Sequence, residues 1–177
     1  VAIAARTVDE ALAQVDAVHA QGADLVKLMI TGGVMDATER GMPGEVKMPA
    51  EMVRAVCERA HALGIPVVLG NDTSCQWVAQ YDFWRELCYF HEYAGASNAC
   101  ALYCATGQSA RMAGLGDVTG TLRPGLCADM LVTSENPLAD LRALRTLDMV
   151  VARGRIIDRP RPKRSARLDA GLDTLLA

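Results

Sequence analysis

The chain has 177 residues, 51% of them hydrophobic, so it is long enough to bury a core and too apolar to be disordered throughout. A formal net charge of -3 argues against general nucleic-acid binding, because it provides no basic stripe for a phosphate backbone. No apolar run reaches the roughly 18 residues of a membrane span, and the first residues lack a signal-peptide pattern. We therefore expect a globular, cytoplasmic protein whose partners are a small-molecule substrate and further copies of itself.

The first predicted unit is a helix followed by a buried strand. Thr7 and Glu10 have the spacing of a capping box, and a helical apolar face follows as far as about Gln21. Residues 24–30 are apolar except for Asp24 and Lys27, the pattern of a strand buried on both faces in a parallel sheet.

A second helix and strand follow with the same order. Pro49 fits the first position of a helix that stops at Gly64, and residues 65–69 form the next apolar run. Asp72 comes directly after this run. Two such units predict an α/β protein with parallel strands and functional loops at their carboxyl ends.

The remaining chain changes character towards its end. An aromatic-rich segment and two shorter helices are expected before two regions of short strands and an extended, solvated tail. These predicted elements are a helical segment over 76–93, a helix capped by Ser97, a helix ending near Gly114, a strand over 128–133, a strand pair or hairpin over 149–157, and the tail over 159–167.

Lys27 needs a reason to lie inside a buried strand, because burying an unpaired ammonium group costs several kcal/mol. Three interpretations remain open from its position. It could form a structural salt bridge, act as a Schiff-base nucleophile as in aldolases, or carry a carbamate that binds metal ions. Asp72, at the end of a strand, could bind a metal and take a proton from bound water, or it could simply cap a turn.

Histidine and cysteine give little further support for a metal site. His19, His61 and His91 all fall on predicted helices, whereas barrel metal sites take their ligands from strand ends. Cys100 and Cys104 are four residues apart on a predicted helix, but no second Cys or His pair has zinc-site spacing. Packing as reduced core residues is the favoured interpretation of the six cysteines.

Three stretches of the sequence resemble the amidohydrolase superfamily, in particular its Xaa-Pro dipeptidase-like and imidazolonepropionase-related branch. Residues 22–35, around Lys27, resemble the fourth barrel strand of that family, and residues 65–73 resemble its eighth strand. The most specific match is the end of the chain, where 120–132, 136–141 and 150–154 resemble the strands that leave the barrel for a small β-sandwich.

The resemblance implies a fold and a site. It implies an α/β chain made of part of a TIM-like (β/α)8 barrel over 1–118, β-sandwich strands over 119–158, and a C-terminal tail over 159–177. It also implies that carboxylated Lys27 bridges two divalent metal ions, expected to be zinc, and that Asp72 is a metal ligand and the general base. The family's histidine ligands have no counterpart here, and the chain passes from the helix after strand four directly to strand eight, so a gap is expected near 62–66.

The function implied is metal-dependent hydrolysis of amide or peptide C–N bonds in small substrates. Two alternatives stand beside it. One is an inactive amidohydrolase remnant that serves as a binding or oligomerisation module, which predicts an unmodified Lys27. The other is a Schiff-base aldolase that uses Lys27, which borohydride trapping would reveal.

Overall fold

The computed structural model describes residues 4–30, 46–73 and 77–176. These form two compact units, one made of Val1–Val67 with Glu92–Gly95 and the other of Val68–His91 with Ala96–Ala177. No helix in the described part of the chain is long and apolar enough to cross a membrane. Each unit has its own apolar core.

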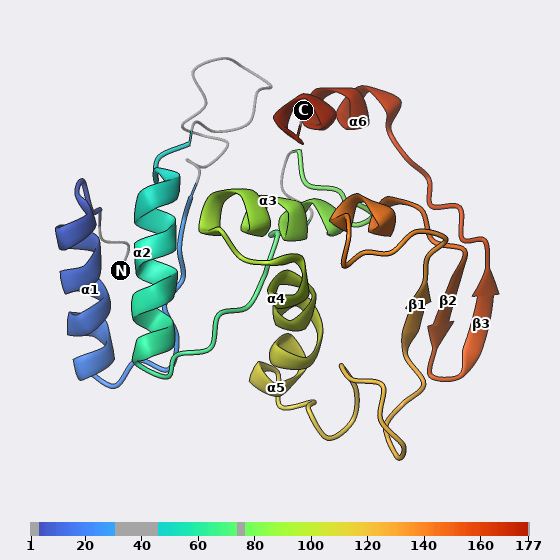
Figure 1. Ribbon diagram of the computed structural model, residues 1–177, viewed down its shortest axis with the longest axis horizontal. Helices are drawn as coiled ribbons and strands as arrows, with labels where there is room; N and C mark the ends of the chain where they lie inside the picture. The colour runs from blue at the N-terminus through green and yellow to red at the C-terminus, as the bar shows by residue number, and fades with distance from the viewer. Residues whose placement is uncertain (1–3, 31–45, 74–76, 177) are drawn as a thin grey trace. The chain divides into compact units, whose positions relative to one another are not determined.

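Two helices make up most of the first unit, α1 (Val8–Ala20) and α2 (Ala50–Ala62), which lie side by side (Figure 1). The predicted capping box is confirmed, since the Thr7 hydroxyl accepts a hydrogen bond from the Glu10 backbone N–H at 3.2 Å. The two helices bury four apolar side chains against each other: Ala11, Val15, Met52 and Val56.

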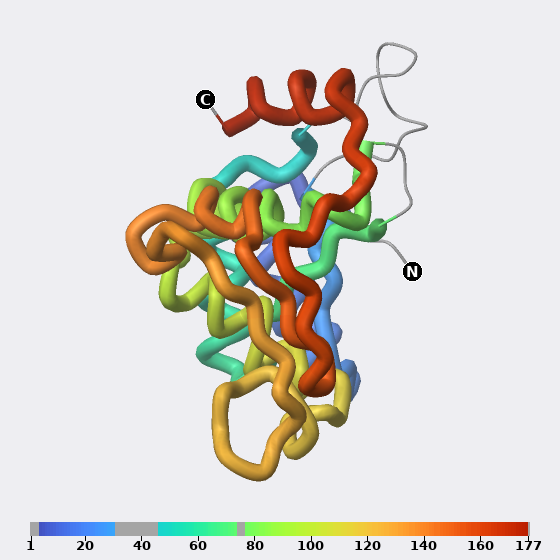
Figure 2. Tube along the Cα trace, turned by 90° about the vertical axis from the view of Figure 1, so that its right-hand side faces the viewer, coloured from blue at the N-terminus to red at the C-terminus, as the bar shows by residue number. Residues whose placement is uncertain are grey.

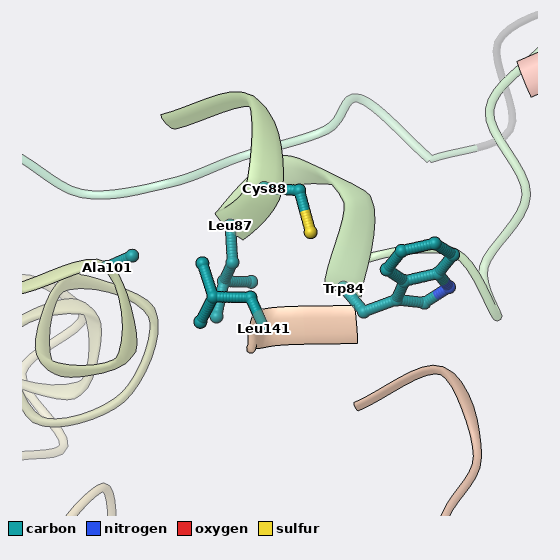
Figure 3. Packing of buried hydrophobic residues seen from close by; sticks show 5 residues of the cluster. All are labelled: Trp84, Leu87, Cys88, Ala101 and Leu141. Atoms are coloured by element: carbon teal, nitrogen blue, oxygen red, sulfur yellow. The ribbon is translucent and has the colours of Figure 1, made fainter. Parts of the chain in front are cut away.

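The second unit begins with a series of helices. They are α3 (Trp84–Ala94), whose residues up to His91 belong to this unit, α4 (Asn98–Tyr103), a π-helical turn (Cys104–Gln108) and α5 (Ser109–Met112). The predicted cap at Ser97 is confirmed, because its hydroxyl accepts the backbone N–H of Cys100. Figure 3 shows the core, in which α3 and α4 meet a short 3-10 helix (Leu141–Arg145) through Trp84, Leu87, Cys88, Ala101 and Leu141.

A three-stranded antiparallel sheet follows, with the order β1 (Met130–Val132), β2 (Met149–Ala152), β3 (Arg155–Asp158). Figures 1 and 2 show the three strands side by side. The turn between β2 and β3 has two residues, Arg153 and Gly154, with φ of 48° and 77°. Positive φ at both positions is the mark of a type I′ turn, which matches the twist of a tight hairpin. The predicted strand near 128–133 and the hairpin near 149–157 are therefore confirmed.

The expected barrel strands are the main correction to the sequence interpretation. Residues 25–30 and 65–70 are extended, but they belong to no strand ladder in the described part of the chain. A strand is held by a ladder of hydrogen bonds to a neighbouring strand. Among the described residues Ile30 accepts the backbone N–H groups of Lys47 and Met48, but these two bonds form no ladder. The molecule is thus mixed helix and strand with a small antiparallel sheet, and no barrel is seen in the residues that are described.

The chain after β3 also differs from expectation. Residues 160–165 are extended as predicted, but a further helix, α6 (Ala166–Asp173), and a 3-10 turn (Thr174–Leu176) follow. Ser165 caps α6 by accepting the backbone N–H of Leu168. Leu172 is buried, so α6 packs on the second unit, whereas most of residues 159–167 are exposed, as expected of a solvated segment.

Candidate functional site

Lys27 lies on an extended segment whose side chains alternate between two environments. Val26 and Leu28 pack against the core of α1 and α2, whereas Lys27 is exposed together with Leu25 and Met29, which are 59% and 56% exposed. The alternation is that of a strand with one face covered. The expected burial of Lys27 is therefore wrong for the described structure, because only the helical layer covers this segment.

The loop that contains Asp72 follows the second extended segment. Asp72 is exposed and adopts a φ of 53°, in the left-handed region that Asp and Asn tolerate better than most residues. Beside it the Thr73 hydroxyl donates a hydrogen bond to the Asn71 side-chain oxygen at 2.6 Å. Residues 74–76, directly after the resembling stretch, lie outside the described residues, as do 31–35 at the end of the stretch around Lys27.

The structure does not bring Lys27 and Asp72 together within one unit, since Lys27 belongs to the first unit and Asp72 to the second. Across the described ranges no group of three or more His, Cys, Asp and Glu side chains could hold a metal ion. His19, His61 and His91 lie on helices, as the sequence predicts, and the Nδ1 atom of His91 lies 2.7 Å from the Ala96 carbonyl oxygen. The described donor atoms do not complete a zinc site.

Sequence reasoning missed a cluster of charged side chains in the second unit. We call it the α6 charge cluster, and it consists of Asp82, Arg85, Arg145, Arg164, Asp169 and Asp173. Arg85 is only 2% exposed and its Nη2 atom lies 2.7 Å from Asp173 Oδ1. Asp82 is 5% exposed and lies between Arg85 and Arg164. Three arginines thus face three carboxylates and balance their charge.

The α6 charge cluster has a structural role. Hydrogen bonds from Arg145 and Arg85 hold the pKa of Asp173 below its usual value, with Arg145 the larger cause. The Arg85 guanidinium also lies 4.5 Å from the centre of the Trp84 ring, a cation–π contact. The ion pairs connect α6 to α3. Because the positive and negative charges cancel, the cluster carries no net charge that could attract a charged substrate. In the sequence, the cluster is indicated by the basic tail and by Asp169 and Asp173 after it, which lie one helical turn apart.

The environment of Glu86, the neighbour of Arg85, differs from that of Asp173. It lies on α3, and burial raises its pKa to about 7. Desolvation disfavours the charged form of a carboxyl group, so Glu86 titrates near neutrality where Asp173 stays ionised.

An open hollow of about 510 Å³ in the second unit is lined by the π-helical turn, α5 and the loop that follows α5. Its charged lining residues are Arg111, Asp117 and Arg123, and the rest is mainly glycine. Arg111 is already engaged, since its guanidinium donates to the Tyr103 hydroxyl at 2.9 Å. The hollow contains no histidine and only one carboxylate among these lining residues, so it does not provide a metal-hydrolase centre.

Comparison with protein-family models gives no match, and comparison with curated proteins gives none. Among solved structures, the chain is similar to a putative prolidase from Bifidobacterium longum, with 26% sequence identity and a TM-score of 0.65 over 100% of this chain. It is also similar to a Xaa-Pro dipeptidase with bound methionine in the active site, with 17% identity and a TM-score of 0.50 over 87% of this chain. The chain spans 66% of the first of these structures and 59% of the second. Both are hydrolases of the amidohydrolase superfamily.

Proposed function

We propose that this chain is part of a hydrolase that cleaves amide or peptide C–N bonds in small substrates, as a dipeptidase or an amidase does. The observation that carries the proposal is the likeness to the putative prolidase, which extends over the whole chain at a TM-score of 0.65. The β2–β3 hairpin supports it independently, because it forms where the sequence most specifically resembles the end of an amidohydrolase.

Lys27 and Asp72 are the residues of this chain that we assign to the metal site of that hydrolase. Lys27 is exposed on the face of its segment that points away from the helical core, where carbon dioxide can reach the amine. Asp72 is exposed on the turn that follows the second extended segment. A divalent metal such as zinc, once bound, would polarise a carbonyl and lower the pKa of a bound water.

The described residues supply at most two ligands of such a centre, so the remaining ligands must come from elsewhere. In the same proposal, residues 119–158 contribute strands to a β-sandwich, and the gap near 62–66 stays a prediction from the sequence. The role of Asp72 is to accept and return a proton, which needs its carboxylate in the ionised form.

The test uses the full chain supplied with Zn²⁺ and measures hydrolysis of Xaa-Pro dipeptides and N-acylated amino acids. Asp72→Asn should lower turnover by roughly 100-fold or more, on the scale of a lost general base, with bound zinc unchanged. Asp117→Asn, at another exposed aspartate, should leave turnover unaltered. Equal turnover in Asp72→Asn and the unmodified chain would refute the role of Asp72, and no hydrolysis of either substrate class would refute the proposed function.

A further inference from the structure

The thiols of Cys100 and Cys104 are close together on the helical segment that runs through α4 into the π-helical turn. Their Sγ atoms are 4.0 Å apart. Residues four apart on a helix lie on one face, so the sequence alone places the two thiols on the same face of the helix. The pair belongs wholly to the second unit and involves neither Lys27 nor Asp72.

The backbone under both thiols is fixed by neighbouring side chains. The Ser97 hydroxyl accepts the N–H of Cys100 at 3.2 Å, and the Ser109 hydroxyl donates to the carbonyl oxygen of Cys104 at 2.6 Å. Ala101, between them in the sequence, is fully buried against α3 in the core (Figure 3). The two sulfur atoms are therefore held in place by the packing of α4 and do not depend on a loop.

The two thiols differ in exposure in a way that suits binding from solvent. Cys104 is 5% exposed, whereas Cys100 is an exposed residue. One sulfur is thus anchored beside the core and the other is open to an incoming ion.

The separation of the sulfur atoms matches a shared metal ion. With metal–sulfur distances of about 2.3 Å, sulfurs 4.0 Å apart subtend an angle of roughly 120° at the metal. This angle is close to that of three-coordinate soft cations, and thiolates prefer soft cations such as Cu(I). No third His, Cys, Asp or Glu completes a group here among the described residues, so a solvent molecule or an added thiol would fill the third position.

We propose that Cys100 and Cys104 form a two-thiolate site for a soft d¹⁰ cation, with Cu(I) as the ion of choice. On binding, each thiol loses its proton and each sulfur forms one bond to the ion. One Cu⁺ and two S–H groups therefore give a Cu(S)₂ centre of charge -1 and two released protons, with no change of oxidation state. Binding should strengthen as pH rises, because protons compete for the same sulfurs.

The test measures Cu(I) retained by the full chain against a competing Cu(I) chelator under anaerobic, reducing conditions. Cys100→Ser should remove one equivalent of retained Cu(I), with affinity at this site lowered by at least about tenfold. This variant should fold normally, because Cys100 is exposed.

A matched control distinguishes the effect of the position of the thiols from the effect of their number. The double variant Ala99→Cys with Cys100→Ser keeps six cysteines but moves one thiol to a different helical face, since Ala99 is five residues from Cys104. It should bind as poorly as Cys100→Ser, while Cys127→Ser should bind like the unmodified chain. Full retention of Cu(I) by Cys100→Ser, or by the double variant, would overturn the proposal.

Discussion

The β2–β3 hairpin and the segments that carry Lys27 and Asp72 are held in different ways. In the hairpin each strand pairs with the next across a two-residue turn. Residues 25–30 and 65–70 have no ladder partner among the described residues. An antiparallel strand finds its partner nearby in the sequence, whereas a parallel strand needs one that is a dozen or more residues away.

The residues that stabilise this chain differ from those proposed to carry its function. The second unit has a core, a sheet and the α6 charge cluster, and its contacts are internal. The segments with Lys27 and Asp72 expose both site residues. Substitutions of the buried residues of the second unit should therefore change the free energy of unfolding, while substitutions at the exposed Lys27 and Asp72 should not.

The largest effect is expected at Arg85. Arg85→Met removes a buried cation from among three carboxylates and should cost about 3–5 kcal/mol, the range for breaking a buried ion pair. Urea unfolding followed by tryptophan emission measures it, because Trp77 and Trp84 both belong to the second unit. The control is Arg159→Met in the same unit, whose ion pair with Asp158 is exposed and should matter much less. Equal losses in the two variants would contradict the importance of burial.

Gly120 tests the packing between α5 and the connection to β1. A Cβ atom on Gly120 would lie 2.4 Å from the Ala110 Cβ atom, and the residue has a φ of 89°. Gly125 has a φ of 92° but open space around it, so Gly125→Ala isolates the backbone cost of about 1–2 kcal/mol. Gly120→Ala should cost about 1–3 kcal/mol more through overpacking. Thermal or urea unfolding of the two variants measures this difference, and equal stabilities would refute the overpacking at Gly120.

Glu86 should make stability depend on pH. Its pKa rises from 4.5 to about 7 on folding, so the folded chain binds more protons than the unfolded chain between these values. The contribution of Glu86 to stability is therefore greatest below about pH 4.5, falls as pH rises to about 7, and then levels off. The change over the whole pH range should be about 3–4 kcal/mol, at about 1.4 kcal/mol for each pKa unit. Urea unfolding at pH 5 and pH 8 should show most of this loss, and Glu86→Gln should remove it; an unchanged slope in that variant would assign the effect to other groups.

The smallest effects are expected at the two assigned metal-site residues. Lys27→Met and Asp72→Asn replace exposed side chains and should alter the free energy of unfolding by no more than about 0.5 kcal/mol. Asn also tolerates the positive φ of position 72. A loss of several kcal/mol in either variant, measured by urea unfolding, would show a structural role instead.

Local signals in the sequence predicted the local parts of the structure. Thr7, Ser97 and the hairpin from Met149 were predictable because caps and tight turns depend on residues a few positions apart. Apolar runs at 24–30 and 65–69 suggested buried strands, but burial depends on neighbours that the run itself does not specify. The position of α6 depends on ion pairs such as Arg85 with Asp173, which are 88 residues apart.

The candidate site was only partly predictable for the same reason. Lys27 and Asp72 were found from their places beside apolar runs, and the structure shows both exposed, in separate units. The Cys100 and Cys104 spacing was visible in the sequence, but the distance between their sulfur atoms required the structure.

The most direct test of the proposed metal site is ¹³C NMR of the zinc-supplied full chain in ¹³C-labelled bicarbonate. The account predicts one lysine carbamate resonance that is absent in Lys27→Met and present in Lys163→Met, where the substituted lysine is also exposed. No carbamate resonance, or one that persists in Lys27→Met, would contradict the assignment of Lys27 as a metal-bridging residue.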